Sequence, residues 1–143
     1  MKPDHAGDCG RIHQACFPFA WSEEDFERLL TSENVFADGA FHSRDASLLG
    51  FALSRQAADE AEILSIAIDP ALQGKGFGRQ LLKAHLAQAQ TRGVHTLFLE
   101  VETGNAAAIK LYRDAGFADV GARPGYYRGR DGASGAAVMR WQA

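Results

Sequence analysis

Three glycines and two cations fall within seven consecutive residues near the middle of the chain. The segment reads Gln73, Gly74, Lys75, Gly76, Phe77, Gly78 and Arg79. An apolar run precedes it and an amphipathic run follows it, so we expect a turn between a strand and a helix. The first amides of a helix lack partners inside the helix and attract anions, and glycines let an anion come close. The segment therefore predicts a phosphate-binding turn, to which Lys75 and Arg79 add positive charge.

Two common nucleotide-binding motifs do not fit the spacing of these glycines. A Walker A loop has Ser or Thr after its Gly-Lys pair, whereas Gly76 follows Lys75. A dinucleotide-binding fingerprint has a further glycine three positions after Gly76, where Arg79 stands. The other interpretation is an ordinary loop with a helix cap, but one glycine would be enough for that. We therefore favour a phosphate site of a different type.

Three polar residues further along the chain occupy positions that could support catalysis. Glu100 lies on a predicted strand at 95–101, on the side opposite its apolar neighbours, so it can face a cleft while they fill the core. Asn105 and Tyr112 are seven residues apart, which is two helical turns, so they lie along one side of the next predicted helix. Each also has an ordinary explanation, as a solvated carboxylate, a helix cap and a helix aromatic with its hydroxyl at the surface.

Another group of residues, near the N-terminus, has the spacing of a metal site on a helix. Its members, at intervals of four, four and three, are His5, Cys9, His13 and Cys16. Gly7 and Gly10 weaken such a helix, and no second ligand cluster follows. We therefore expect no metal, with Cys16 as a small core residue and the histidines in solvent.

Length and composition limit what the whole chain can be. Its 143 residues match one domain spanning 1–143, and 46% hydrophobic with 23% charged residues is the balance of a globular protein. A net charge of −3 gives no general reason to bind nucleic acid or an anionic membrane. No apolar run approaches the roughly 20 residues of a membrane span, and the first ten residues lack a signal peptide's apolar segment. We therefore expect a cytoplasmic protein without membrane or direct nucleic-acid partners.

Periodicity predicts alternating helices and strands without repeats or linkers. We expect helices at 8–17, 22–30, from the glycines to Arg92 and Gly93, and at 105–115. We expect two strands within 35–54, then strands at 62–68, 95–101, 117–122 and 136–141. Trp21 and Phe26 have the spacing of a hydrophobic staple around a cap at Ser22. This order of elements predicts an α+β fold with helices packed on a largely antiparallel sheet.

The glycine segment resembles a known cofactor loop. Gln73, Gly76 and Gly78 match the Q/R-x-x-G-x-G/A segment of the GCN5-related N-acetyltransferases (GNAT). The resemblance implies that residues 73–79 hold the diphosphate of acetyl-coenzyme A through their amides. It also implies a GNAT fold, which is a mixed, mostly antiparallel sheet of six to seven strands flanked by about four helices, and a cosubstrate without a metal.

The same resemblance extends to the strand before the loop. In this family the backbone of that strand pairs with the pantetheine arm of the cosubstrate. The corresponding residues here are Ile66, Ala67 and Ile68.

A narrower resemblance covers the chain from about residue 17 to residue 139. Segments at 19–22, 99–101, 105–109, 111–112, 116–117 and 126–127 are similar to the RimI-type enzymes, which acetylate the N-terminal alanine of a small-subunit ribosomal protein. Two positions depart from that pattern. Glu102 stands where arginine is usual, and Ser134 with Gly135 stands where a Glu-Asp pair is frequent. These departures do not affect the predicted acetyl transfer, but they leave the identity of the acceptor open.

The resemblance assigns a role to each candidate residue. Glu100 would be the base, acting through water, and Tyr112 would return a proton to the departing thiolate. Asn105 would contact coenzyme A while it caps its helix. The substrate side would be formed by Tyr126, Tyr127 and Glu102, although the tyrosines are equally well explained as strand aromatics.

The chemistry of the acceptor favours a protein N-terminus. An α-amino group titrates near pH 8 and lysine near 10.4, so the reactive fraction at neutral pH is larger for the N-terminus by on the order of 10²–10³. One carboxylate acting through water suffices for such an amine. A small-molecule amine or a lysine side chain remains an alternative acceptor, and a non-catalytic acyl-coenzyme A binding module is a further alternative.

Overall fold

The computed structural model describes residues 1–123 and 135–143. The helices are α1 (Ala6–Cys16), α2 (Glu23–Thr31), α3 (Phe77–Thr91) and α4 (Ala106–Asp114), with 3-10 turns η1 (Pro3–His5) and η2 (Pro70–Leu72). The strands are β1 (Val35–Phe41), β2 (Leu48–Ala57), β3 (Glu60–Ile68), β4 (Thr96–Glu102), β5 (Ala118–Arg123) and β6 (Ala136–Gln142). Within the described residues the predicted elements are therefore all present.

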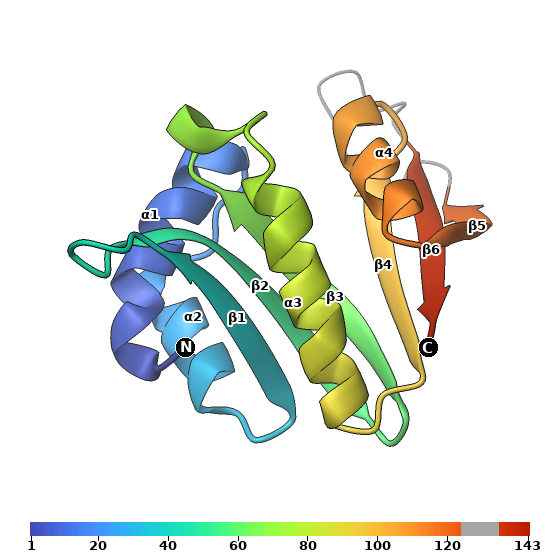
Figure 1. Ribbon diagram of the computed structural model, residues 1–143, viewed down its shortest axis with the longest axis horizontal. Coiled ribbons are helices and arrows are strands. Elements are labelled where there is room, and N and C mark those ends of the chain that lie inside the picture. The colour runs from blue at the N-terminus through green and yellow to red at the C-terminus, as the bar shows by residue number, and fades with distance from the viewer. Residues whose placement is uncertain (124–134) are drawn as a thin grey trace.

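The strands form one sheet in the order β1-β2-β3-β4-β6-β5. Four of the five neighbouring pairs are antiparallel, and only β3 and β4 run parallel, joined by α3 as the crossover. Figure 1 shows α3 and α4 in front of this sheet, with α1 and α2 behind its β1–β3 half. The six strands and four α-helices of the described residues confirm the predicted α+β fold class.

Two core clusters lie on opposite faces of the sheet. One joins α3 and α4 to β3, β4 and β6, and includes Leu82, Leu97 and Tyr112. The other joins α1 and α2 to β2 and β3, and includes Cys9 and Phe51. None of the helices within the described residues is long and apolar enough to cross a membrane.

The start of α2 follows the sequence prediction closely. Ser22 Oγ accepts the amide of Asp25 at 3.1 Å, and the Asp25 carboxylate accepts the amide of Ser22 at 2.9 Å. These two hydrogen bonds satisfy amides that the helix itself leaves free. Trp21 and Phe26 pack with ring centroids 5.5 Å apart, which confirms the hydrophobic staple. The contact between the two rings packs the connection between α1 and α2 against the core cluster that contains Phe26.

The β2–β3 hairpin is longer than the sequence indicated. The predicted strands end at 54 and begin at 62, whereas β2 reaches Ala57 and β3 starts at Glu60. Ala58 turns the chain with a φ of 56°, a left-handed conformation usually taken by glycine or asparagine. Because alanine gives no turn signal, sequence patterns could not locate this turn.

A buried polar network fixes α3 on the sheet. His85, in the middle of α3, lies 2.6 Å from Ser54 Oγ through Nε2 and 2.6 Å from Asp38 Oδ2 through Nδ1. Ser54 and His85 are fully buried, and the His85 ring stacks on Phe36 with centroids 4.8 Å apart. The sequence predicted His85 only as part of the inward face of α3. Its ring in fact links that helix to β1 and β2 through hydrogen bonds.

Candidate active site

The sheet opens between β3 and β4. The two strands pair only through Glu60 with Thr96, Ala61 with Leu97 and Glu62 with Phe98. Beyond these pairs they diverge, as Figure 1 shows, although β3 continues to Ile68 and β4 to Glu102. The second half of β3 therefore pairs with β2 along one edge but does not pair with β4 along the other.

A β-bulge accompanies the opening. Ser65 pairs with Leu53 and Ile63 pairs with Ser54, so Leu64 is an extra residue between them. The bulge changes the alternation of side chains along β3. As a result Ile66 packs toward α3, whereas Ala67 belongs to the cluster under α1 and α2.

The glycine segment forms the turn that leads into α3, as predicted. Gly74 and Gly76 have φ angles of 79° and 87°, which require residues without a Cβ. A Cβ at either position would meet no atom within 4 Å in the described structure. Backbone conformation therefore explains these two glycines, and the space above them is open. The first intrahelical hydrogen bond runs from Gln80 N to Gly76 O at 3.2 Å, so the amides of 77–79 precede it.

The first residue of the Q-x-x-G-x-G pattern ties the turn to its surroundings. Gln73 Nε2 donates to Ile68 O at 3.1 Å, and Cys16 Sγ donates to the same carbonyl at 3.3 Å. A Cβ on Gly78 would lie 3.6 Å from Leu111, an ordinary contact distance. The glutamine thus holds the turn at the end of β3, where the strand faces the opening.

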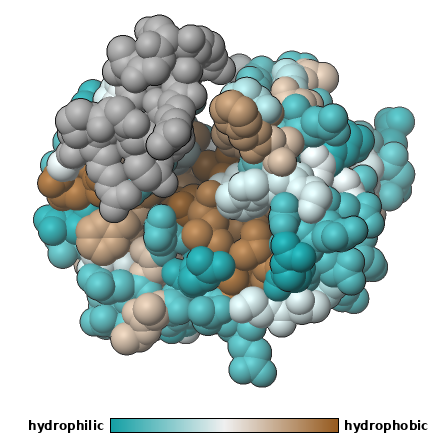
Figure 2. All heavy atoms as spheres, turned by 180° about the vertical axis from the view of Figure 1, so that it is seen from behind, coloured by the Kyte–Doolittle hydropathy of each residue, from teal (hydrophilic) through white to brown (hydrophobic). Residues whose placement is uncertain are grey.

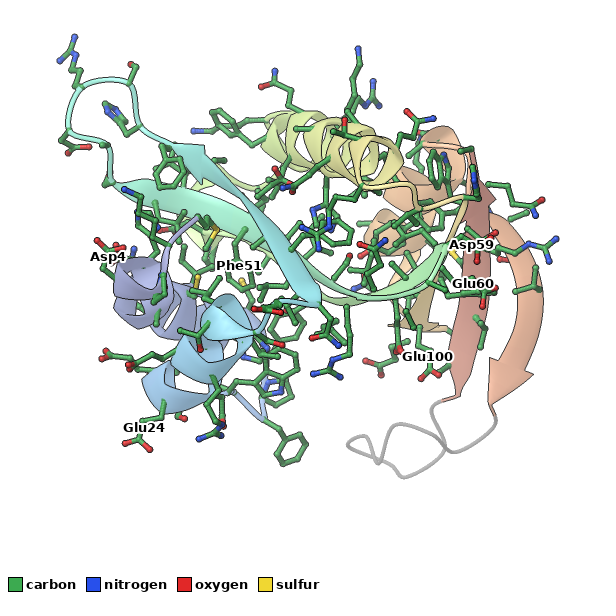
Figure 3. The ribbon with its side chains drawn as sticks, turned by 90° about the horizontal axis from the view of Figure 1, so that it is seen from below. Asp4, Glu24, Phe51, Asp59, Glu60 and Glu100 are labelled. Carbon is green, nitrogen blue, oxygen red and sulfur yellow. The ribbon has the colours of Figure 1, made fainter. Side chains whose placement is uncertain are left out.

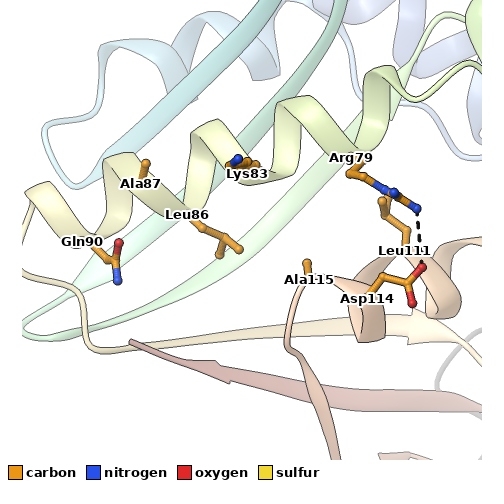
Figure 4. A pocket seen from close by; sticks show the side chains of 8 residues that line it. All are labelled: Arg79, Lys83, Leu86, Ala87, Gln90, Leu111, Asp114 and Ala115. Carbon is orange, nitrogen blue, oxygen red and sulfur yellow. Dashed lines mark ion pairs between the residues drawn. The ribbon is translucent and has the colours of Figure 1, made fainter.

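A groove lies between α3 and α4 beside this turn. It has a volume of about 640 Å³ and is lined by Arg79, Lys83, Leu86, Ala87, Gln90, Leu111, Asp114 and Ala115 (Figure 4). The cations stand at the end nearest the turn, and apolar side chains from both helices form its walls. Arg79 and Lys83 therefore bring positive charge to the groove near the start of α3, where Asp114 adds a negative charge.

Side chains of β4 alternate between the two faces, as the sequence predicted. Leu97, Leu99 and Val101 are buried in the cluster below α3 and α4. Glu100 points to the other face, the side on which α1 and α2 lie (Figure 3). Its Oε2 atom is buried. The carboxylate thus lies on the strand that borders the opening, opposite the face that carries the groove.

Asn105 and Tyr112 lie on α4. Asn105 Oδ1 accepts the amide of Ala108 at 3.2 Å, which confirms its role as a helix cap. Tyr112 is only 7% exposed and packs against Phe117 with ring centroids 5.7 Å apart. Its ring therefore belongs to the core on the groove side of β4, while its catalytic role and the alternative of a hydroxyl at the surface both stay predictions. Glu100 and Tyr112 thus lie on opposite faces of the sheet.

The substrate side is described in part. Glu102 ends β4 with intermediate exposure, on the same face as Glu100. Tyr126 and Tyr127 lie outside the described residues, so their predicted place over the substrate stays a prediction. Figure 2 shows apolar atoms gathered in the middle of this face, next to α2. A second hollow of about 570 Å³ opens there, lined by Trp21, Asp25, Arg28, Leu29, Ser32, Arg55 and Leu64.

The N-terminal histidines and cysteines have structural roles. The helix through them forms, and Cys9, fully buried in the core, has its pKa raised by burial and by Asp8 to about 12. His13 is also buried, although we expected it in solvent, because Phe17, Trp21 and Phe26 surround its ring. Its Nδ1 accepts the amide of Trp21 at 3.0 Å. In residues 1–123 and 135–143 no group of three or more acidic, histidine or cysteine side chains is arranged to hold a metal.

Three residues at the site were not predicted from the sequence to lie there. Lys83 lines the groove one turn after Arg79, Cys16 reaches the end of β3, and Asp114 forms an ion pair with Arg79 at 3.7 Å. Each belongs to an element distant in sequence or to a helix face without a motif. Arg79 and Asp114 come together only because α3 lies beside α4.

Comparison with known proteins identifies the family. The profile of the acetyltransferase (GNAT) family matches residues 7–117. A [ribosomal protein bS18]-alanine N-acetyltransferase of Salmonella typhimurium is 37% identical over 134 residues, which cover 90% of this chain and 85% of that relative. The chain belongs to the GNAT family. The predicted resemblance to this family and to its RimI-type members is thereby confirmed.

Further GNAT relatives agree in sequence and in structure. The N-alpha-acetyltransferase RimI of Mycobacterium tuberculosis is 42% identical over 112 residues, or 76% of this chain and 68% of that protein. The crystal structure of the ribosomal-protein-S18-alanine N-acetyltransferase from Escherichia coli superimposes with a TM-score of 0.91 at 33% identity. It covers 99% of this chain and 90% of its own. The enzyme is therefore an N-acetyltransferase with the GNAT fold.

Proposed function

We propose that this enzyme transfers an acetyl group from acetyl-coenzyme A directly to the α-amine of a protein N-terminus, the alanine of a small-subunit ribosomal protein. Relatives that share 37–42% of their residues with the chain are named for N-terminal or ribosomal-protein alanine acetylation. The observation that carries the proposal is the opening between β3 and β4, with Glu100 on one face and the glycine turn with its groove on the other.

The residues around the opening fit an acyl-coenzyme A. Open space above Gly74 and Gly76, free amides at 77–79 and nearby cations suit a diphosphate. Ile66 and Ala67 have backbone groups beside the opening, whereas the Ile68 carbonyl is already engaged by Gln73. Under this proposal residues 73–79 would hold the phosphates, the β3 backbone at 66–68 the pantetheine arm, and Asn105 a further part of the molecule. Bound acetyl-coenzyme A supplies a thioester, which is a reactive acyl donor.

Glu100 and Tyr112 would divide the proton transfers between the two faces of the sheet. Glu100 would accept a proton from the acceptor amine, through water, on the face of α1 and α2. Tyr112, on the groove side, would supply a proton to the departing sulfur. A phenol with a pKa near 10 is well matched to a thiolate of similar basicity. Base and acid would thus act on opposite sides of the acetyl carbon, to which both the amine nitrogen and the sulfur are bonded during transfer.

The acceptor would approach from the face that carries Glu100. Glu102, on the same face, together with Tyr126 and Tyr127, would contact the residues that follow the N-terminal alanine. The lower pKa of an α-amine makes it an easier substrate for one carboxylate than a lysine side chain is. A ribosomal substrate would place the enzyme in the cytoplasm, where no membrane or direct nucleic-acid contact is needed.

The proposal is tested by following thiol release from acetyl-coenzyme A with three kinds of acceptor. These are a peptide that begins with alanine, the same peptide with a blocked N-terminus and an internal lysine, and a panel of small amines. We expect turnover with the free alanine N-terminus and little with the others. Preference for a small amine would replace the protein substrate, and cofactor binding without turnover on any acceptor would favour a non-catalytic binding module.

A further inference from the structure

Asp114 places a carboxylate in the groove opposite the glycine turn. It is the last residue of α4, and its Oδ2 atom lies 2.6 Å from Lys110 Nζ. The same oxygen lies 3.7 Å from the guanidinium of Arg79, across the groove (Figure 4). One carboxylate oxygen thus contacts cations from both helices.

Asp114 lies at the end of its helix that is unfavourable for a carboxylate, and these cations stabilise its charge there. The carbonyl end of a helix carries partial negative charge, which disfavours a carboxylate there. The hydrogen bond from Lys110, helped by the charges of Lys110 and Arg79, lowers the pKa of Asp114. The side chain is therefore an anion at neutral pH, held by Lys110 of its own helix and by Arg79 across the groove.

Arg79 also lies next to the turn at which the cofactor phosphates would bind. It is the third residue of α3, in the same helical turn as the free amides of 77–79. Guanidinium groups bind carboxylates and phosphates through the same donor geometry. Asp114 and a phosphate at the turn would consequently compete for the same side chain.

We propose that Asp114 is an internal competitor for Arg79 that weakens the binding of acetyl-coenzyme A. This inference rests on the proposed function, because it needs the cofactor phosphates at residues 73–79. The side chains of Arg79 and Asp114 are 73% and 41% exposed, so their ion pair is weak and a phosphate displaces it. Asp114 therefore reduces affinity without closing the site. The effect is the same for acetyl-coenzyme A and coenzyme A, since both carry the same phosphates.

Isothermal titration calorimetry of coenzyme A tests this competition. Asp114→Asn keeps the shape of the side chain and removes its charge, so we expect the dissociation constant to fall about two- to fivefold at low salt. Asp119→Asn is the matched control. It removes the same charge from another exposed carboxylate, which pairs with Arg113 at 2.7 Å on β5 and does not line the groove. We expect that control to bind coenzyme A like the unmodified enzyme.

A double-mutant cycle separates competition from simple repulsion. Arg79→Gln should weaken binding, and in its background Asp114→Asn should change the dissociation constant by less than its effect alone. An equal effect with and without Arg79, or identical effects of Asp114→Asn and Asp119→Asn, would overturn the competition while leaving the proposed function intact. If the unmodified enzyme binds no coenzyme A at all, the proposed function fails and the inference fails with it.

Discussion

Two groups of polar side chains in this enzyme differ in how they are hydrogen-bonded and in whether a substrate could reach them. Ser54, His85 and Asp38 form an ordered chain of hydrogen bonds, the arrangement found in many hydrolases. Its serine and histidine are fully buried, and neither lines one of the two hollows described above. Glu100 lies instead on β4, beside the opening between β3 and β4.

The comparison shows that an ordered triad is not by itself a catalytic site. A nucleophile needs room for a substrate, and the cluster around His85 is filled by Phe36 and the core of α3. The three side chains instead satisfy one another's hydrogen bonds beneath α3, the helix that the glycine turn leads into. The buried network below α3 and the open space at its N-terminus are thus properties of the same element, and variants at four places in the protein follow from this comparison.

The largest expected effect is loss of catalysis at the opening. Glu100→Gln should reduce turnover by about 10²–10³-fold at neutral pH, because the amide cannot accept the proton from the amine. Tyr112→Phe, which keeps the buried ring, should reduce it by about tenfold or more. Steady-state rates with an alanine-initiated peptide measure both, and coenzyme A binding by calorimetry is the control. Unchanged rates in both variants would remove the catalytic assignment.

Removing the buried network should affect stability and leave the chemistry in place. His85→Leu deprives Ser54 and Asp38 of a partner, so the free energy of unfolding should fall by roughly 1–3 kcal/mol. Urea denaturation measures it. The double variant Ser54→Ala with His85→Leu, which removes the stranded hydroxyl as well, should recover part of the loss. A fall in turnover as large as that of Glu100→Gln would contradict the division between the two groups.

Relief of the competition at Arg79 is a smaller effect. Asp114→Asn should tighten coenzyme A binding by about two- to fivefold, as described above. The gain should shrink as salt is added, because both side chains of the ion pair are exposed. A gain that does not depend on ionic strength would speak against an electrostatic origin.

The smallest effect concerns acid stability near the connection between α1 and α2. Burial lowers the pKa of His13, so below about pH 6.5 the unfolded chain binds more protons than the folded one. Stability should therefore fall as the pH falls from 6.5 toward the lowered pKa. Asn at this position can still accept the Trp21 amide but does not titrate, so the His13→Asn variant should lose less stability between pH 7.5 and pH 5. Equal losses in urea melts of both proteins would show that His13 does not contribute.

Local chemistry made much of the fold and part of the site predictable from the sequence. The cap at Ser22, the glycine turn and the alternation of β4 depend on residues close together in the chain. The burial of His13 and Tyr112 was not predictable, because it depends on side chains that other elements bring to them. The same holds for the opening of the sheet, since no residue of β3 or β4 signals where pairing ends.

The short seam between β3 and β4 has a thermodynamic consequence. Among the described residues, three strand pairs join β3 to β4, and His95 and Thr96 add backbone hydrogen bonds to Asp59 beside them. Acyl donor bound in the opening beyond these pairs, as proposed, would contact both strands where they no longer pair with each other. Since such a molecule binds the folded chain and not the unfolded one, its concentration should set how firmly the two sides of the opening hold together, and the melting temperature should climb as acyl donor is added.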